Sequence, residues 1–415
     1  MKKPTLLFVE EIKNSLSKKI ISRKDIQLVL LRFKQSMFFD ESYLKETSTI
    51  YCFVFNKEAS IRDEVKRFKI FCSENNLKID YFYNDSEYNQ ETIQEFAYSL
   101  GLYGAINKDQ ALCVRDKAVM KNRMQKIGYK TMAYGEIFSI YDVLSFTKKA
   151  GGFPVIVKWR KGLSSKEVYK INSVNELQKL GLNFSKNRYI VEQYCSDLIW
   201  CIDSLIQNGK VVATFYAWLP YTNLSFAETK EKFAQITVDR KPEWFKFDGS
   251  EITQNIINEI GLKNGYIHLE VFVSSVGEPI ICEFAWRTPG EHMLLNHSIV
   301  FDLDVYSLLI DIIIGKTISL KLNGRKCVGD MFLPIKNGIV SDITPYKDLE
   351  KFKGVINGSI TCNVGDILES KRQYTSCAGW IQVEGKTKEE VLERMLNVYK
   401  NFKIETKKSP NQLVS

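Results

Sequence analysis

Short apolar runs alternate with helix-like stretches along the first hundred residues. The runs at 27–33, 50–55 and 77–82 have the length of buried strands, and 61–72 carries apolar residues at helical spacing. This rhythm predicts a layer of βαβ units. No Gly-x-Gly-x-x-Gly follows a strand there, so we expect a platform and not a dinucleotide site.

The pattern becomes helical after residue 104. We expect one long helix over 108–127, ended by Gly128, and a second helix over 137–149. A short apolar strand at 155–157 follows. These elements separate the platform from a strand-rich second half.

Strands dominate that second half. They are expected from 189 to about 215, where Asn208-Gly209 is a hairpin-turn signal, and again from about residue 322. The polar stretch 222–240 is expected to be a mobile loop. Three further helices are predicted, at 252–260, 305–314 and 388–399. The sequence therefore predicts a mixed α/β (α+β) protein.

Two glutamates lie on neighbouring predicted strands joined by a short loop that contains Gly277. If Val273 faces Glu278 in this hairpin, Glu270 faces Ile281, and Glu283 lies diagonally across on the same face. Two like charges that close repel unless a cation lies between them, which favours a magnesium site. Spacing alone is equally consistent with two solvent-facing glutamates. The apolar run around Glu283 favours a buried, partnered carboxylate.

Composition and charge narrow the class of protein. The 415-residue chain is 45% hydrophobic, which is enough for two or three domains with their own cores. Its net charge of +9 comes from scattered basic residues, so no nucleic-acid partner is expected. The nine cysteines include no Cys-x-x-Cys and adjoin no histidine, so neither a zinc site nor a disulfide framework is expected.

No targeting or membrane segment is evident in the sequence. The N-terminus lacks the long apolar stretch and cleavage site of a signal peptide. The longest apolar candidate, 305–314, is too short to span a bilayer and is interrupted by Asp311. We therefore expect a soluble cytoplasmic protein with no membrane partner.

Two lysines and one strand end add candidate nucleotide contacts. Lys158 ends the 155–157 strand and opens a Gly/Ser loop, where an ammonium and backbone N–H groups can meet a phosphate. Lys117, midway along the first long helix, offers a second contact, and Glu192 closes a strand whose end can hydrogen-bond adenine. Taken singly, each is more often a surface lysine or an ordinary strand residue.

Taken in order, these pieces resemble the ATP-grasp superfamily. The resemblance covers about residues 101–315, roughly half the chain, and five ordered motifs are more specific than any one. The motifs are Asp116-Lys117, Lys158 with its Gly/Ser loop, Glu192-Gln193-Tyr194, Ile202-Asp203, and the set Glu270, Glu283 and Arg287.

The resemblance implies an ATP and metal site. Its ATP-binding residues would be Lys117, Lys158, Gly162, Ser164, Ser165, Glu192, Gln193, Tyr194 and Cys195. Glu270 and Glu283 would ligate Mg²⁺, with Mn²⁺ left open, and Arg287 would stabilise a phosphorylated intermediate. His268, opposite Glu283 in the register assumed above, would border the site and either bind substrate or serve a structural role.

A narrower likeness is to the carboxylate-amine ligases, including those that join amino acids. Glu283 to Gly290 matches their Glu-x-x-x-Arg-x-x-Gly ending, which makes Gly290 a candidate substrate contact, and 329–340 is similar to their C-terminal segment. The implied parts are an N-terminal α/β domain (1–110), an ATP-grasp region (111–320, lid about 131–190) and a C-terminal α+β segment (321–415).

The chain departs from the family pattern at three places. Ala285 stands where the family often has Asn, which removes one metal or phosphate ligand. Asp197 and Ile199 stand where relatives commonly carry Gly and a nucleotide-orienting Glu, and Gly162 is the single glycine of the lid loop.

The resulting hypothesis is an ATP-dependent ligase. It would join a carboxylate and an amine through an acyl phosphate. Both substrates would be small molecules, and the resemblance implies amino acids. A carboxylase-type enzyme that activates bicarbonate and a nucleotide-binding scaffold with weakened catalysis are the alternatives. A homodimer is left open.

Overall fold

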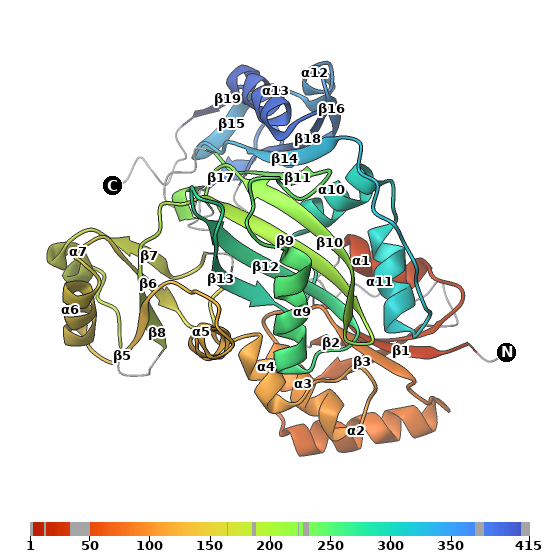
Figure 1. The fold of residues 1–415 in the computed structure, drawn as a ribbon. Helices are drawn as coiled ribbons and strands as arrows, with labels where there is room; N and C mark the ends of the chain where they lie inside the picture. Colours follow the sequence, from red (N-terminus) through yellow and green to blue (C-terminus); the bar gives the residue numbers. More distant parts are fainter. Residues whose placement is uncertain are drawn as a thin grey trace.

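Four sheets organise the computed structural model of the chain (Figure 1). The structure describes residues 3–11, 14–33, 50–163, 165–184, 188–222, 224–226, 232–369 and 377–407. They are a parallel N-terminal sheet, a small antiparallel sheet, a large central sheet and a three-stranded sheet in the C-terminal part.

The N-terminal sheet is parallel and has the order β3-β2-β1-β4. Its strands are β1 (Thr5–Val9), β2 (Gln27–Phe33), β3 (Ile50–Phe55) and β4 (Tyr81–Asn84). The helices beside it are α1 (Ser15–Ser22), α2 (Ile61–Glu74) and α3 (Gln90–Ser99). Alternate residues face opposite sides, so Leu7 packs with α2 and α3 while Phe8 packs with α1.

The predicted βαβ rhythm is confirmed here with two corrections. The strands at 27–33 and 50–55 have the predicted bounds, whereas the third begins only at Tyr81. The Leu77 N–H donates to the Cys72 carbonyl (2.8 Å) and closes the end of α2, so these residues terminate a helix. β1 was not predicted, because a five-residue buried parallel strand shows no alternation.

The predicted long helix over 108–127 is wrong in its continuity. It consists of α4 (Lys108–Cys113) and α5 (Lys117–Lys126). Asp116 caps α5, because its carboxylate accepts hydrogen bonds from the N–H groups of Ala118 (3.0 Å) and Val119 (3.3 Å). Lys117 is therefore the first residue of a helix and not a residue midway along one.

The small antiparallel sheet, which we call the lid sheet, projects to the left in Figure 1. Its order is β5-β8-β6-β7, with β5 (Tyr134–Ile137), β6 (Val155–Trp159), β7 (Val168–Ile171) and β8 (Tyr189–Gln193). Helices α6 (Ile140–Lys149) and α7 (Val174–Lys179) pack on it. The helix predicted from 137 begins at Ile140, because Ser139 and Asp142 form a capping box.

The central sheet has eight antiparallel strands in the order β13-β12-β9-β10-β11-β14-β18-β16. They are β9 (Ile199–Gln207), β10 (Lys210–Leu219), β11 (Ala234–Val238), β12 (Gly265–Val273), β13 (Pro279–Ala285), β14 (Cys327–Leu333), β16 (Val355–Ile360) and β18 (Gly379–Gly385). Asn208 and Gly209 turn the β9–β10 hairpin at φ 51° and 72°, as predicted. The stretch predicted as a loop over 222–240 contains β11, which pairs with β10 and β14.

Helices cover both faces of this sheet. α9 (Gly249–Ile260), α5 and α13 (Lys388–Asn401) bury apolar residues against one face. α10 (Glu291–Phe301) and α11 (Val305–Ile313) lie on the other, together with the N-terminal sheet. Successive residues of β12 point to opposite faces of the sheet. Ile267 and Leu269 pack on the face that α5, α9 and α13 cover, while His268 and Glu270 lie on the other face.

The C-terminal part completes the central sheet and adds the three-stranded sheet β17-β15-β19. Its remaining elements are β15 (Gly338–Ile343), α12 (Tyr346–Leu349), β17 (Ile367–Leu368) and β19 (Ile404–Lys407). Within the described residues, no one helix has the length and apolar character to cross a membrane. By length and composition only, the bent pair His292–Phe301 and Val305–Ile313, with an angle of 103° between them, meets that test together.

Candidate active site

A cavity of about 520 Å³ lies where the N-terminal sheet, the lid sheet and the central sheet meet. This volume is in the range of small-molecule sites. Thirteen of the fourteen candidate residues line it: Lys117, Lys158, Gly162, Ser165, Glu192, Gln193, Tyr194, Cys195, His268, Glu270, Glu283, Arg287 and Gly290. The fourteenth, Ser164, lies outside the described residues.

The two glutamates of the β12–β13 hairpin face each other directly. Val273 pairs with Pro279, and the register shifts by one residue at a β-bulge, which leaves Cys282 as the extra residue and places Glu270 opposite Glu283. The predicted common face is therefore correct. The predicted register is wrong by one residue at the turn, where Val273 pairs with Pro279 and not with Glu278, and by one more beyond the bulge. Alternation alone reveals neither shift.

Three lysines and two carboxylates form what we call the lysine cluster. Its residues are Lys117, Lys121, Lys158, Glu192 and Glu283. The Nζ atoms of Lys117 and Lys158 lie 3.3 and 3.8 Å from Glu283 Oε2. Lys158 Nζ also lies 2.9 Å from Glu192 Oε2, and Lys121 Nζ lies 3.2 Å from Glu192 Oε1. The cluster thus holds an extra cation that the sequence reasoning missed, Lys121, one helical turn after Lys117.

The cluster fixes the charge state of its members. Burial alone would raise the pKa of Glu283, but Lys117 and Lys158 outweigh it and lower that pKa to about 2. Burial would likewise lower the pKa of Lys158, and the carboxylates of Glu192 and Glu283 raise it well above its ordinary value. Glu283 and Lys158 therefore stay charged at neutral pH inside the cavity.

The lid sheet is tied to α5 by the loop that follows β6. Lys158 lies within β6, opposite Val168, and not beyond the end of the strand. Lys117 N–H donates to the Arg160 carbonyl (3.1 Å), and Lys117 Nζ donates to the Gly162 carbonyl (2.7 Å). These bonds place the loop over the lysine cluster, where it can cover a bound phosphate.

The candidate adenine segment lies at the end of β8. Glu192 is buried and both of its oxygens lie beside lysines, so it bridges the cations. The Gln193 N–H donates to the Ala133 carbonyl (2.9 Å), which removes this group from those that can reach adenine. Lys170 lies over the Tyr194 ring at 4.0 Å, and Cys195 lines the cavity.

A second charged group, the histidine cluster, lies across the hairpin from the lysine cluster. It comprises Asp203, Thr237, His268, Glu270 and His297. Asp203 Oδ1 lies 2.6 Å from His268 Nδ1, and Oδ2 lies 2.8 Å from His297 Nε2. His268 Nε2 lies 3.4 Å from Glu270 Oε1, and Thr237 Oγ1 lies 2.9 Å from His297 Nδ1. A continuous polar chain thus runs from the cavity into the core.

Asp203 controls the protonation of this cluster. Burial would raise the pKa of Asp203, but His268 and His297 lower it. Burial would lower the pKa of His268, yet Asp203 and Glu270 raise it to about 9. His268 pairs with Ala285 and not with Glu283 as predicted, because the register differs by one residue at the turn and by a second at the bulge.

Arg287 is held by acidic residues of the N-terminal sheet. Its Nε donates to Glu87 Oε2 (2.6 Å), and Asp85 accepts hydrogen bonds from the N–H (2.8 Å) and hydroxyl (2.6 Å) of Thr288. Asp85 and Glu87 follow β4 and line the cavity, so this sheet contributes to the site and is more than a platform. The sequence analysis did not identify Asp85 and Glu87 as candidates. Their position directly after a parallel strand could have indicated them, because ligands bind at the carboxyl ends of strands in open α/β sheets.

The first turn of α10 borders the same cavity. Gly290 is its N-cap residue and has no side-chain cap, so the amide groups of the first turn have no side-chain partner from that residue. The ring of His292 packs at a tilt of 37° against Trp380, with 4.1 Å between the ring centroids, and its Nδ1 lies 3.4 Å from Asp330 Oδ2. A helix N-terminus beside Arg287 suits an anionic group of a ligand.

The residues present fit a magnesium ion. Glu270 and Glu283 offer hard oxygen atoms from paired strands, and a second cavity of about 20 Å³ adjoins them. That space is lined in part by Ala285 and is large enough for one water molecule or ion. A small residue at this position therefore leaves room that a larger side chain would fill.

Comparisons with known proteins place this geometry in a known fold. No family model matches the chain. Over 275 residues it is 23% identical to a Bacillus subtilis L-arginine-specific L-amino acid ligase, a match that covers 64% of this chain and 65% of that protein.

Two solved structures share nearly the whole fold. An L-amino acid ligase from Bacillus licheniformis superposes with a TM-score of 0.77 at 14% identity, covering 98% of this chain and 100% of that one. The biotin carboxylase domain of Hydrogenobacter thermophilus 2-oxoglutarate carboxylase, solved with MgADP, ADP and bicarbonate, gives 0.68 at 14% identity over 98% and 91% of the two chains. The chain therefore has the ATP-grasp fold and resembles the carboxylate-amine ligases of that superfamily.

Proposed function

We propose that the protein is an ATP-dependent ligase that joins a carboxylate to an amine, with amino acids as substrates. The substrate carboxylate attacks the γ-phosphorus of ATP, so ADP leaves and an acyl phosphate forms. The amine then attacks the acyl carbon, phosphate leaves, and the amine gives up a proton. Phosphorylation is needed because oxide is a poor leaving group and phosphate is a good one.

The lysine cluster carries this proposal. Lys117 and Lys158 place two ammonium groups within 3.8 Å of Glu283 inside a cavity large enough for a nucleotide. Fixed cations in a partly dry site stabilise the charge that develops on a transferring phosphoryl group. Lys121 and Glu192 hold Lys158 in place behind them. We assign the phosphate contacts to Lys117 and Lys158 on this basis.

Glu270 and Glu283 would hold magnesium. Bound there, the ion neutralises phosphate charge and polarises the transferring group. The protein would supply two carboxylate ligands whose neighbours differ. Glu283 lies beside the lysines, and Glu270 lies beside His268.

The opposite end of the cavity would bind the substrates. We assign the substrate carboxylate and its acyl phosphate to Arg287, whose planar guanidinium matches two oxygens. Glu87 orients this guanidinium, and the N-terminus of α10 at Gly290 adds backbone donors. The names of the two L-amino acid ligases support amino acids as the substrate class.

A substrate panel tests the proposal. Purified protein with Mg²⁺ and ATP is incubated with pairs of L-amino acids, and phosphate release and product mass are recorded. We expect phosphate release that depends on an amino acid pair, with a product of the summed mass less one water. Turnover that requires bicarbonate instead would identify a carboxylase, and ATP binding without turnover under any substrate set would identify a scaffold.

A further inference from the structure

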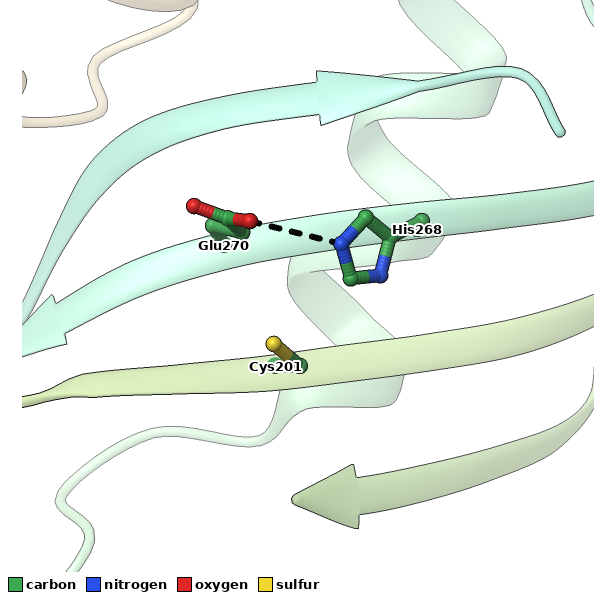
Figure 2. A group of neighbouring side chains, drawn as sticks. All are labelled: Cys201, His268 and Glu270. Carbon is green, nitrogen blue, oxygen red and sulfur yellow. Dashed lines mark ion pairs between the residues drawn. The ribbon is translucent and has the colours of Figure 1, made fainter. Parts of the chain in front are cut away.

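The cavity-facing sides of β9 and β12 bring together a cysteine, a histidine and a glutamate. Figure 2 shows Cys201 on β9 and His268 and Glu270 on β12, with their side chains directed toward one another. Each offers one ligand atom, and these atoms all lie within 4.8 Å of one another. All three residues line the main cavity, so the group is open to a small ligand on one side.

The spacing of the nitrogen and oxygen atoms suits a tetrahedral ion. His268 Nε2 and Glu270 Oε1 lie 3.4 Å apart. An ion about 2.1 Å from each of two tetrahedral ligands holds those ligands about 3.4 Å apart. Cys201 Sγ lies within 4.8 Å of both atoms, and the bond that a zinc ion makes to sulfur is longer, at about 2.3 Å.

Asp203 prepares the histidine for this task. Its carboxylate is fully buried and accepts the Nδ1–H of His268 at 2.6 Å, which directs Nε2 toward Glu270. A carboxylate that holds the far nitrogen of a ligating imidazole is a recurrent feature of metal sites. His297 holds the other oxygen of Asp203, and Thr237 holds His297 in turn, so the imidazole orientation is determined by buried groups.

The donor set selects a particular class of metal. Thiolate and imidazole prefer borderline ions such as Zn²⁺ or Co²⁺, whereas Mg²⁺ prefers carboxylate and water. Three protein ligands leave a fourth position toward the cavity for water or a ligand. Binding releases the Cys201 thiol proton and any proton on His268 Nε2 to solvent.

We propose that Cys201, His268 and Glu270 form a site for Zn²⁺ or a similar borderline divalent cation, separate in chemistry from the magnesium site. Glu270 is shared between the two, so an ion in this site withdraws one magnesium ligand. Only this last consequence rests on the proposed function. The site makes the cavity responsive to zinc.

Cobalt binding to the full-length, metal-free protein without nucleotide tests the site. We expect a thiolate-to-cobalt charge-transfer band that saturates at one Co²⁺ per chain and is displaced by Zn²⁺. Cys201→Ser should abolish the band, while the matched variant Cys195→Ser, which removes another thiol from the same cavity, should retain it. His268→Gln should weaken cobalt binding at least about 10-fold.

Two results would overturn the inference. One is the absence of a charge-transfer band in the wild-type protein, and the other is a band that persists in Cys201→Ser. Urea unfolding of each variant shows that it is folded before its spectrum is interpreted. Because the assay uses neither ATP nor amino acids, its failure leaves the ligase proposal standing, and a failed ligase assay leaves the metal site standing.

Discussion

The lysine cluster and the histidine cluster each include one glutamate of the β12–β13 hairpin. They show how neighbouring residues determine the chemistry of a side chain. Glu283 and Glu270 face each other across β12 and β13, on the same face of the same sheet. Glu283 lies among ammonium groups, which hold its pKa at about 2. Glu270 instead lies beside an imidazole that Asp203 orients from behind.

The difference assigns the two clusters different tasks. The two ammonium groups of Lys117 and Lys158, which converge on Glu283 in the cavity, suit a polyphosphate. The imidazole and thiol of the other side suit a borderline metal. Identical residues in paired positions therefore need not share a role, and each role can be removed separately.

Glu283→Gln should have the largest effect. The amide keeps the shape of the side chain but removes a carboxylate from among three lysines, so we expect ATP-dependent phosphate release to fall at least about 100-fold. Steady-state phosphate release at saturating Mg²⁺ measures this. The matched control is Glu278→Gln in the loop of the same hairpin, which should keep wild-type turnover. Unchanged turnover in Glu283→Gln would contradict the metal assignment.

Lys158→Met should impair both nucleotide binding and folding. Removal of one partner from a buried ion pair leaves Glu192 with Lys121 alone, and we expect a loss of about 3 kcal/mol in the free energy of unfolding. Urea unfolding and nucleotide titration measure the two effects. Lys148→Met, on the exposed face of α6, is the control. Equal stability of the two variants would show that the lysine cluster does not act as a buried network.

His268 should make stability depend on pH in a defined window. Its pKa is raised from 6.5 to about 9, so the folded state binds the proton more tightly than the unfolded chain. The resulting stabilisation is complete below about pH 6.5 and is lost as pH rises through about 9, with a size of up to about 3 kcal/mol. Urea unfolding in the presence of a chelator measures it, and His268→Gln should flatten the profile between these values. A wild-type profile equally flat in that window would refute the assignment.

The smallest effect is expected at an exposed ion pair between Glu278 in the loop of the same hairpin and Lys130, which lies between α5 and β5. Lys130 Nζ lies 2.9 Å from Glu278 Oε2 near the loop, where both side chains are exposed. Solvent screens such pairs, so Lys130→Met should not measurably shift the urea midpoint. A shift comparable to that of Lys158→Met would mean that burial is not what distinguishes the clusters.

Local signals in the sequence predicted many of the elements and thirteen of the residues that line the cavity. The apolar runs gave the bounds of β2 and β3, and Asn208-Gly209 gave the β9–β10 turn. Short motifs near the ends of strands identified candidate residues on β6, β8, β12 and β13. The structure brings these residues to one cavity. α10 was not predicted, because it packs against β11, β14 and α11 and shows no single apolar face.

Features that depend on pairing between distant segments could not be predicted. The bulge at Cys282 changes which residues face each other, and no alternation pattern marks it. Cys201 and His268 come together only because β9 pairs with β12. Cysteine spacing along the sequence argued against a zinc site, but it cannot detect ligands that lie on separate strands. Asp85 and Glu87 reach the site because the N-terminal sheet packs beside it.

Trapping with hydroxylamine tests the central claim most directly. The wild-type protein is incubated with Mg²⁺, ATP, one accepted amino acid and hydroxylamine in place of the amine substrate. The account predicts an amino acid hydroxamate formed in equal amount to ADP, because hydroxylamine captures an acyl phosphate, and predicts neither product above background in Glu283→Gln. ADP formed without any hydroxamate, or formed only when bicarbonate is present, would contradict it.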